Sequence, residues 1–334
     1  MTATLKDVAE FAGVSIRTVS RVVNNQGEIT EETRQRVSAA IHQLGYRPNQ
    51  LARSLITGET LTIGIIIPDI TDPFFPEFIL GAESVARERG YNIFLSNANR
   101  QPDLELKYID LLSQRQVDGL IIAGSRLDEE TLKAVTEQHH AVILTPYSIP
   151  GKTIFTIDDF DGGRQIGEHL LDLGHQRVGY IEGTWSRGYK GRQAGLVSAF
   201  EMAGNAKAIV KTSVFPARIE SASQATRELL QQEPDLTALV GYNDVVALGI
   251  LQACRELGKK VPEDVSVVGF DDIPEVSRTC PELTSVHIDR LELGGKMMQC
   301  LLDQIGEKSQ GSERVIVKGR LIKRASSARA SLIK

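Results

Sequence analysis

From Leu61 onward, seven apolar segments typical of β-strands alternate with stretches long enough to form amphipathic helices. These segments are LTIGIII, NIFLS, DGLIIA, AVILT, RVGYIEG, TALVGY and VSVVGF. Strands separated by helices form parallel sheets that helices cover on both faces. The pattern therefore predicts an α/β core of two similar Rossmann-like lobes. Ligands of such folds bind beyond the carboxyl ends of the strands, so we expect a site in the cleft between the lobes.

The N-terminal part of the chain predicts a small all-α domain instead. Thr4 and Ser15 are good N-caps for two short helices, and Gly13 supplies the turn between them. Thr30 begins a third helix, which Gly45 ends. Helix, short turn and helix at this spacing form a helix-turn-helix unit. The three helices are expected to share a core formed by Leu5, Val8, Ala9, Val14, Val19, Val37, Ile41 and Leu44.

The charge of this N-terminal domain differs from that of the rest of the chain. The whole chain carries a formal net charge of −5, yet residues 1–57 hold seven Lys and Arg against five acidic residues. Residues 11–27 and 33–58 together contain six arginines and no Asp or Glu. Arginine surfaces without acidic neighbours predict a polyanionic partner for this domain alone. The alternative is a small helical domain whose arginines are merely solvated.

A second helix placed in the DNA major groove would present its first residues to the base edges. Ile16 and Arg17 begin that helix, and Arg21 follows one turn later. Arginine can bond guanine O6 and N7 as a pair, and isoleucine can contact a thymine methyl group. Short side chains suited to phosphate oxygens are Ser15, Thr18, Ser20, Asn24, Thr30 and Thr33.

The segment YRPNQLARSLITGE connects the two parts of the chain. Pro48 suits the first turn of a short helix and Gly58 ends it. A helix this short is unstable alone in water, where about 12–15 residues are already marginal. The segment is therefore predicted to be a hinge that becomes helical when something holds it. The expected organisation is 1–46 for the head, 47–60 for the hinge and 61–334 for the core, with lobe 1 at about 61–158 plus 288–317 and lobe 2 at about 159–287 plus 318–332.

The stretches LKDVAEFAGVSIRTVSRVVN and ITEETRQRVSAAIHQLGYRPNQLARSL resemble the DNA-binding head and hinge of the LacI/GalR family of bacterial transcriptional regulators. The resemblance continues through IGIIIPDITDPFF, VDGLII, GYNDVVALG, VPEDVSVVGFDD and PELTSV, and so spans essentially the whole chain. It implies that Ile16, Arg17 and Arg21 read bases, and that Leu55 inserts into the minor groove of a palindromic operator. Ordinary packing against its own lobe is the alternative for Leu55. The hinge contacts implied are Asn49, Ala52, Arg53 and Leu55.

The resemblance also implies a core of the periplasmic-binding-protein type I that binds a small effector, a sugar or related metabolite. Aromatic faces suit the CH faces of sugars, and charged groups suit their hydroxyls. Asp244 and Asp271 also stand where helix N-caps belong, which is the alternative role for them. The effector contacts implied or inferred are Asp72, Phe74, Ser125, Arg192, Phe215, Asn243, Asp244, Asp271 and Arg290.

Two departures from the family pattern bear on the effector. Thr145 and Pro146 stand where many sugar-responsive members carry an Asp, and Ile288-Asp289-Arg290 replaces a common glutamine-proline pair. Arg290, together with Ser125 and Arg126, favours an acidic or otherwise unusual effector.

Other classes of protein fit less well. The chain has no GxxxxGK[ST], GxGxxG after a strand, GxSxG or HExxH motif, and its six histidines show no metal-ligand spacing, so we expect no enzyme, cofactor or metal. The main alternative is a periplasmic-type sugar-binding transport protein. The opening MTATLKDVAEFAG lacks the basic and apolar regions of a secretory signal, and the head argues against transport. We therefore expect a cytoplasmic, nucleoid-associated homodimeric repressor with no membrane partner, which binds a pseudo-palindromic double-stranded operator.

Overall fold

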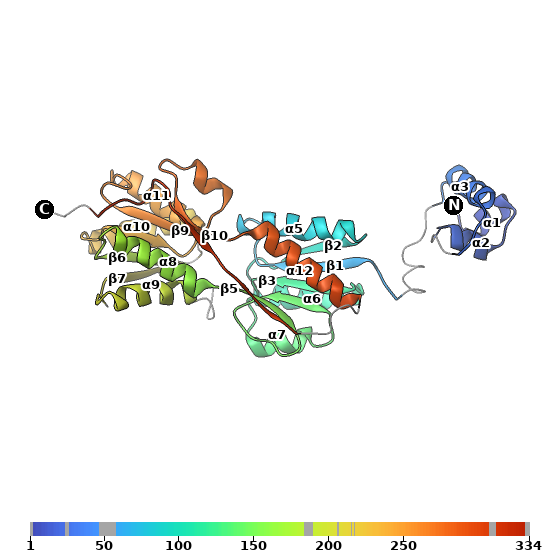
Figure 1. The fold of residues 1–334 in the computed structure, drawn as a ribbon, viewed down its shortest axis with the longest axis horizontal. Helices are drawn as coiled ribbons and strands as arrows, with labels where there is room; N and C mark the ends of the chain where they lie inside the picture. The colour runs from blue at the N-terminus through green and yellow to red at the C-terminus, as the bar shows by residue number, and fades with distance from the viewer. Residues whose placement is uncertain are drawn as a thin grey trace. The chain divides into compact units, whose positions relative to one another are not determined.

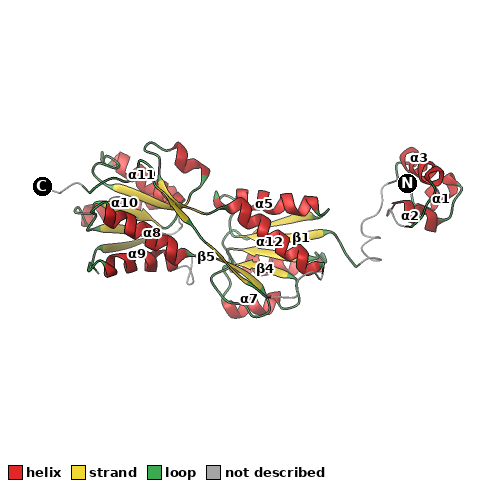
Figure 2. Cartoon of the chain, in the orientation of Figure 1, coloured by secondary structure: helices red, strands yellow, loops and turns green. Residues whose placement is uncertain are grey.

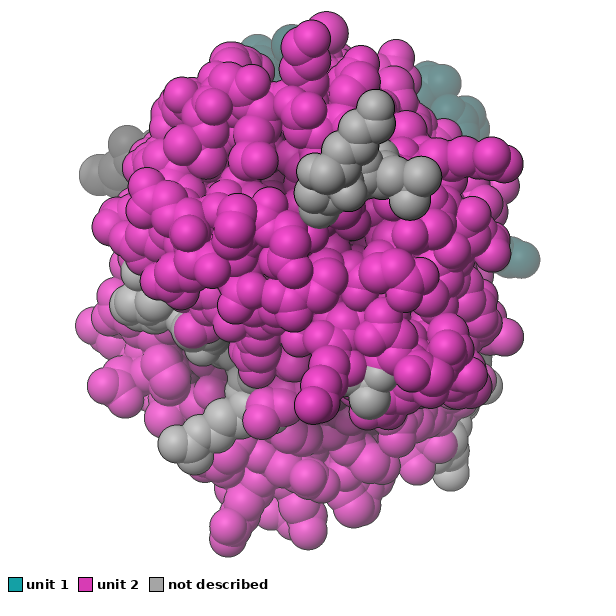
Figure 3. Space-filling view, turned by 90° about the vertical axis from the view of Figure 1, so that its left-hand side faces the viewer, with its two compact units in different colours: residues 1–60 teal, residues 61–334 magenta. Residues whose placement is uncertain are grey.

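The computed structural model describes residues 3–23, 27–46, 58–183, 190–205, 207–214, 216, 218–306 and 312–330. The chain divides into two compact units, residues 1–60 and residues 61–334, which Figure 3 distinguishes by colour. Each unit has its own hydrophobic core. No helix in these described ranges is both long and apolar enough to span a bilayer.

The first unit contains three helices: α1 (Leu5–Ala12), α2 (Ile16–Val23) and α3 (Glu31–Leu44). Thr4 and Asp7 form a reciprocal capping box at the start of α1, and Gly13 ends that helix in the left-handed conformation at φ 62°. Thr30 caps α3, and Gly45 ends it in the same way. The sequence predicted each of these helix boundaries from the caps and glycines.

The core of the first unit lies where the three helices meet. Val8 from α1, Val19 from α2 and Val37 from α3 are fully buried. Around them pack half-buried side chains at helical spacing, which include Leu5, Val14, Ile41 and Leu44. Tyr46, which directly follows α3, also belongs to this cluster.

The second unit consists of two α/β lobes (Figures 1 and 2). The sheet of lobe 1 has the strand order β11 (Arg314–Val317), β5 (Thr153–Ile157), β4 (Ala141–Leu144), β3 (Gly119–Ala123), β1 (Thr62–Ile67), β2 (Asn92–Asn97). The sheet of lobe 2 has the order β12 (Arg320–Ile322), β10 (Thr284–His287), β9 (Ser266–Asp271), β8 (Ala238–Gly241), β6 (Val178–Gly183), β7 (Ile209–Val214). All neighbours are parallel except β10 and β12. The two lobes therefore share one topology, as the sequence predicted.

Helices cover both faces of each sheet (Figure 1). In lobe 1, α5 (Phe74–Glu88) and α12 (Arg290–Ile305) pack on one face, and α6 (Pro102–Gln114) and α7 (Glu129–Thr136) on the other. In lobe 2, α8 (Asp159–Asp172) and α9 (Gly191–Met202) pack on one face, and α10 (Ile219–Gln232) and α11 (Asp244–Glu256) on the other. A 3₁₀-helix, η1 (Pro274–Arg278), follows β9. The chain passes between lobes after β5, after β10 and between β11 and β12.

The described residues form twelve strands, whereas the sequence analysis identified seven. Three of the missed strands, β10, β11 and β12, have only three or four residues. Two missed strands, β5 and the short β10, lack a continuous apolar run because they bury hydroxyl side chains such as Thr153, Thr284 and Ser285. The edge strand β7 alternates between half-buried and exposed positions. Apolar runs indicate most central strands and the edge strand β2, whereas the edge strand β7 and the strands at the crossings between lobes are missed.

Candidate functional site

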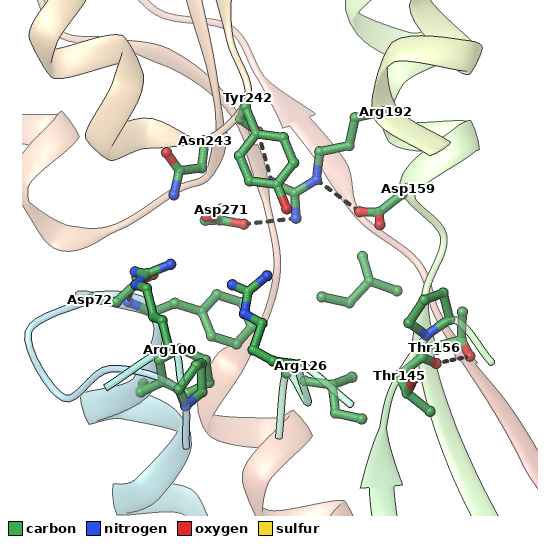
Figure 4. Close-up of a pocket in the computed structure, with 17 residues that line it drawn as sticks. Asp72, Arg100, Arg126, Thr145, Thr156, Asp159, Arg192, Tyr242, Asn243 and Asp271 are labelled. Carbon is green, nitrogen blue, oxygen red and sulfur yellow. Dashed lines mark hydrogen bonds and ion pairs between the residues drawn. The ribbon is translucent and has the colours of Figure 1, made fainter. Parts of the chain in front are cut away.

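A pocket lies between the two lobes of the second unit, where the carboxyl ends of strands from both sheets meet (Figure 4). About 820 Å³ of space not filled by atoms lies there, part of it open to solvent. One part of its wall is apolar and includes Phe74, Phe75, Leu144, Pro146 and Ile157. The polar part of the wall consists of Asp72, Arg100, Arg126, Thr145, Thr156, Asp159, Arg192, Tyr242, Asn243 and Asp271.

Arg192, from the first turn of α9, is the centre of the lobe 2 wall. Its Nε donates to Asp159 Oδ1 at 2.8 Å, and its Nη1 donates to the carbonyl oxygen of Tyr242 at 2.8 Å. The guanidinium stacks over the Phe270 ring at 3.7 Å from the ring centroid. Burial alone would lower the pKa of Arg192, but the neighbouring carboxylates raise it above its usual value. Arg192 is therefore a fixed cation of the pocket.

Asp271 ends β9 and reaches the same cation from the other side. Its Oδ1 lies 3.4 Å from Arg192 Nη2, an ion pair without a hydrogen bond. That oxygen is buried and has no hydrogen-bond partner among the described residues. Burial raises the pKa of Asp271 to about 7, against the opposing effect of Arg192. The backbone of Asp271 is in the positive-φ region at 104°, where a side chain other than glycine is strained.

The lobe 1 wall contains a second arginine with two carboxylates. Arg100, just after β2, donates from Nε to Asp69 at 3.0 Å and from Nη2 to Asp72 at 2.9 Å. The other oxygen of Asp72 accepts from the backbone N–H of Phe74 at 3.1 Å. Both oxygens of Asp72 are thus used inside lobe 1, where Asp69 and Asp72 share the single positive charge of Arg100.

Arg126 lies on the loop that follows β3, and its side chain points into the pocket toward Tyr242 and Asp271 (Figure 4). A buried carboxylate beneath the pocket, Glu105 of α6, holds this loop. Ser125 Oγ donates to Glu105, and the backbone N–H of Arg126 donates to Glu105 Oε2 at 2.9 Å. Burial raises the pKa of Glu105. The positive charge of Arg126 acts across the cleft, since it opposes the effect of burial on the pKa of Tyr242.

The sequence-predicted effector contacts divide into two groups. Those that line the pocket are Asp72, Phe74, Arg192, Asn243 and Asp271. Asn243 also caps α11, since its side chain accepts from the backbone N–H of Val246 at 3.0 Å. Phe215 lies outside the described residues. The structure does not place Ser125, Asp244 or Arg290 in the pocket wall.

Asp244 and Ser125 have internal partners instead. Asp244 is fully buried and accepts from Ser285 Oγ at 2.6 Å and from the Ile273 N–H at 2.8 Å. It thereby connects α11 to the segment that follows β9 and to β10 itself. Ser125 Oγ donates a hydrogen bond to Glu105 and accepts one from the Leu127 N–H. Their positions explain why polar residues after strands need not face the ligand.

Arg290 connects the lobes. It begins α12 in lobe 1 and donates to Glu77 of α5 at 2.9 Å and 2.6 Å. It also donates to the carbonyl oxygens of Asp271 and, at 3.0 Å, Asp272, both at the end of a lobe 2 strand. Only 3% of Arg290 is exposed. Its charge therefore supports the strained backbone behind Asp271 rather than facing the pocket.

Three further residues line the pocket although the sequence did not indicate them as effector contacts: Arg100, Asp159 and Tyr242. Each follows, or lies within two residues of, a strand end: β2 for Arg100, β5 for Asp159 and β8 for Tyr242. The available signal was position after a strand, combined with the expectation that all strands of both sheets end at the cleft.

The first unit presents an exposed surface at the start of α2. Ile16 is 49% exposed, and Arg17 and Arg21 are exposed beside it. No acidic residue lies in the first turn of α2, and no ion pair to either arginine is found within the described part of this unit. An exposed apolar side chain between cations suits a surface that another molecule covers.

The other predicted DNA contacts of the first unit have mixed placements. Ser15 and Thr18 bond each other at 2.9 Å, and Ser15 accepts from the Thr18 N–H at 3.1 Å, which makes Ser15 the cap of α2. Thr30 caps α3 and contacts Thr33 Oγ1 at 2.9 Å. Ser20 is half-buried. The predicted DNA contacts that lie outside the described residues are Asn24, Asn49, Ala52, Arg53 and Leu55.

Comparison with known families decides between the possible classes. Residues 4–49 match the family described as bacterial regulatory proteins, lacI family, and residues 60–325 match periplasmic binding proteins and sugar binding domain of LacI family. The chain belongs to the LacI family. It is a DNA-binding transcriptional repressor and not an enzyme. The match of the head to a regulatory family also disfavours the sugar-transport alternative.

Individual LacI-family proteins resemble the chain over nearly its whole length. The HTH-type transcriptional repressor PurR of Haemophilus influenzae (strain PittEE) is 34% identical over 318 residues, which cover 93% of this chain and 94% of that protein. The lac repressor dimer bound to operator and the anti-inducer ONPF has a TM-score of 0.90 at 29% identity and covers 98% of this chain and 100% of its own. A LacI family regulator from Enterococcus faecium with bound ribose has a TM-score of 0.74 at 29% identity, covering 81% of this chain and 100% of its own.

Proposed function

We propose that this LacI-family chain acts as a homodimer on a pseudo-palindromic operator and that a small effector, a carbohydrate or related metabolite, switches its operator affinity from the pocket between the core lobes. One head reads one half-site, and two-fold symmetry doubles the contacts. The similar lac repressor structure is a dimer on its operator, which supports this arrangement.

The observation that carries the effector proposal is the buried Asp271 carboxylate in the pocket wall. A buried oxygen with no hydrogen-bond partner among the described residues costs free energy that a bound hydroxyl would recover. Aromatic residues line the same pocket and offer faces for the CH groups of a ring. A similar regulator binds ribose, which is consistent with a carbohydrate or a related compound.

In the head, we assign base reading to Ile16, Arg17 and Arg21. Their exposure at the first turns of α2 places an apolar group and two guanidinium groups where a recognition helix meets base edges. We assign phosphate contacts to Ser15, Thr18, Ser20, Asn24, Thr30 and Thr33. The hinge residues Asn49, Ala52, Arg53 and Leu55 remain sequence-based assignments to the minor groove and backbone.

The test is operator binding by the purified chain. Genomic DNA fragments are screened for specific binding at fixed salt, and bound fragments are then titrated with sugars, sugar acids, sugar phosphates and nucleosides. Loss of binding with one compound identifies an inducer, and gain identifies a co-repressor. Absence of any specific fragment contradicts the operator proposal, whereas specific binding that no compound alters contradicts the effector proposal.

Replacing Arg17 by Ala should weaken operator binding by about 1–3 kcal/mol and relax the preference at one base pair of each half-site. The reason is the loss of a guanidinium that bonds a base edge, and the measurement is the affinity for operators mutated at each position. Arg36→Ala, on the exposed face of α3, is the matched control. This variant should weaken binding to operator and to random DNA by about the same factor. That factor should be smaller than the loss of operator binding caused by Arg17→Ala. Equal losses on operator and random DNA for Arg17→Ala would contradict base reading.

A further inference from the structure

The charged groups of the pocket are divided unequally between its two walls. In lobe 1, the charged lining residues are Asp72, Arg100 and Arg126. Arg100 bonds both Asp69 and Asp72, and Arg126 is a second cation of this wall, outside that cluster. In lobe 2, Asp159 and Asp271 outnumber Arg192, so that wall is negative when both are ionised. A ligand that spans the pocket therefore meets a cation on one side and carboxylates on the other.

The position of Arg126 is built into the fold. Glu105, only 2% exposed, holds both Ser125 and the backbone N–H of Arg126 beneath the pocket. Burying a carboxylate is costly unless its hydrogen bonds are satisfied, and here they fix the loop that carries the arginine. Figure 4 shows the guanidinium between the apolar lobe 1 wall and the lobe 2 groups. In such partly desolvated surroundings, a guanidinium favours a planar anionic partner with two oxygens.

The opposite wall points to hydroxyl groups on the same ligand. Asp271 Oδ1 is buried and without a hydrogen-bond partner among the described residues, and a carboxylate oxygen accepts from a hydroxyl. Asn243, Thr145 and Thr156 add neutral polar groups to the lining. The rings of Phe74 and Phe75 lie edge to face, with their centroids 5.3 Å apart. Both rings form part of the apolar wall between the two polar regions.

We propose that the effector is a small hydroxylated anion, a sugar acid or a sugar phosphate, whose anionic oxygens bind the Arg126 guanidinium while its hydroxyls bind Asp271. This inference rests on the proposed function, because it names the chemical class of the ligand of that same pocket. Of the three residues that suggested an acidic effector in the sequence, only Arg126 lines the pocket. Ser125 supports its loop and Arg290 connects the lobes.

The experiment is calorimetric titration of the full chain with matched pairs of compounds. Glucuronate is paired with glucose, gluconate with sorbitol, and ribose 5-phosphate with ribose. At least one anionic member should bind at least tenfold more tightly than its neutral partner. The carboxylate and phosphate pairs distinguish which anionic group is bound. Neutral members that bind as well as the anionic ones, or an absence of anionic binding at millimolar concentrations, would overturn the proposal.

Variants show whether Arg126 is responsible. Arg126→Met retains length and removes charge, and should reduce the preference for the anionic member by roughly 10–100-fold, as expected for a charge-assisted contact. Arg126→Lys retains the charge without the fork and should preserve part of the preference. Arg278→Met, at an exposed position of η1, changes the net charge equally and should have no effect. An undiminished preference in Arg126→Met would also overturn the proposal.

The operator assay separates the two proposals. If a neutral compound changes operator binding and no anionic compound does, the regulator proposal stands and the anionic effector is wrong. If a sugar acid or sugar phosphate binds the pocket with the expected Arg126 dependence but leaves operator affinity unchanged, the ligand class is supported and the effector-switch proposal fails.

Discussion

Asp271 combines three features that rarely occur in one residue: a buried carboxylate, an oxygen without a hydrogen-bond partner among the described residues, and a positive-φ backbone. Each costs folding free energy. The largest effects of neighbouring charges on its carboxylate come from Arg192, Asp72, Arg290 and Asp159. Such a cost is retained where a binding site needs a fixed acceptor, so Asp271 has the properties of a site that a ligand completes.

Replacing Asp271 by Asn should therefore stabilise the unliganded chain at pH 8. The folded pKa of about 7 lies above the unfolded value, so stability is lost as pH rises from about 4 through 7, and the amide removes this loss. We expect the gain to be roughly 2–3 kcal/mol larger at pH 8 than at pH 5, measured by urea unfolding. Asp110→Asn, at an exposed position of α6, should show no such pH-dependent difference. A loss of stability at both pH values would contradict the assignment.

At the residue scale, the resemblance to the LacI/GalR family was the useful signal in the sequence. Arg192 and Asp271 were selected and line the pocket, whereas Asp244, beside Asn243, faces the protein interior. Neighbouring residues at a strand end point in different directions, and the sequence does not state which one reaches the cleft. Arg100 and Tyr242 were missed because their roles depend on how two separate sheets face each other.

At the level of elements, α5 and α12 pack with their backbones nearly in contact. A Cβ added at Gly294 would lie 1.9 Å from the carbonyl oxygen of Phe78, and one added at Gly81 would lie 2.0 Å from that of Leu291. Lobe 2 repeats the arrangement between α8 and α9, where Gly163 and Gly195 have the same relation to Arg192 and Phe160. Because the Gly163 contact is the backbone of Arg192, this close packing also sets the position of a pocket cation.

Gly294→Ala should destabilise the core by about 2–4 kcal/mol, since the helices must separate to admit a methyl group. Its neighbour provides the control. A Cβ at Gly295 would meet nothing closer than 3.6 Å, so Gly295→Ala should be neutral or stabilise the helix by up to about 1 kcal/mol. Urea midpoints of the two variants give the comparison. Similar midpoints would show that the helices separate at little cost.

The sequence predicted elements well where one physical rule dominated. Caps and glycines predicted the three head helices, and continuous apolar runs predicted the central strands of both sheets. The rule failed for β5 and β10, which bury Thr and Ser because hydrogen bonds to neighbouring segments satisfy the hydroxyls, as Thr284 Oγ1 does with the carbonyl of Arg324 at 3.2 Å. Such strands depend on tertiary partners that a local pattern does not contain.

At the scale of the whole molecule, two units with separate cores must exchange information if an effector is to control DNA binding. Within the core, a ligand bound to both walls would favour one separation of the lobes. Arg290 bonds Glu77 in one lobe and the carbonyl oxygens beside Asp271 in the other, so it connects the pocket to the α5–α12 pair. The control is then a coupling free energy between two binding sites, and such a coupling acts equally in both directions.

The reciprocity of this coupling can be measured. If the effector changes operator affinity by a factor of about 5–150, operator DNA should change effector affinity by the same factor and in the same sense. Calorimetric titration of the effector into the full chain, with and without operator, measures it, and DNA with scrambled half-sites is the control. Residues 61–334 alone, which contain the whole pocket and their own core, should bind the effector as the DNA-free full chain does. A contrary result is that the compound changes operator affinity while operator DNA leaves the affinity for the compound unchanged. That result would mean that the compound does not act through this equilibrium.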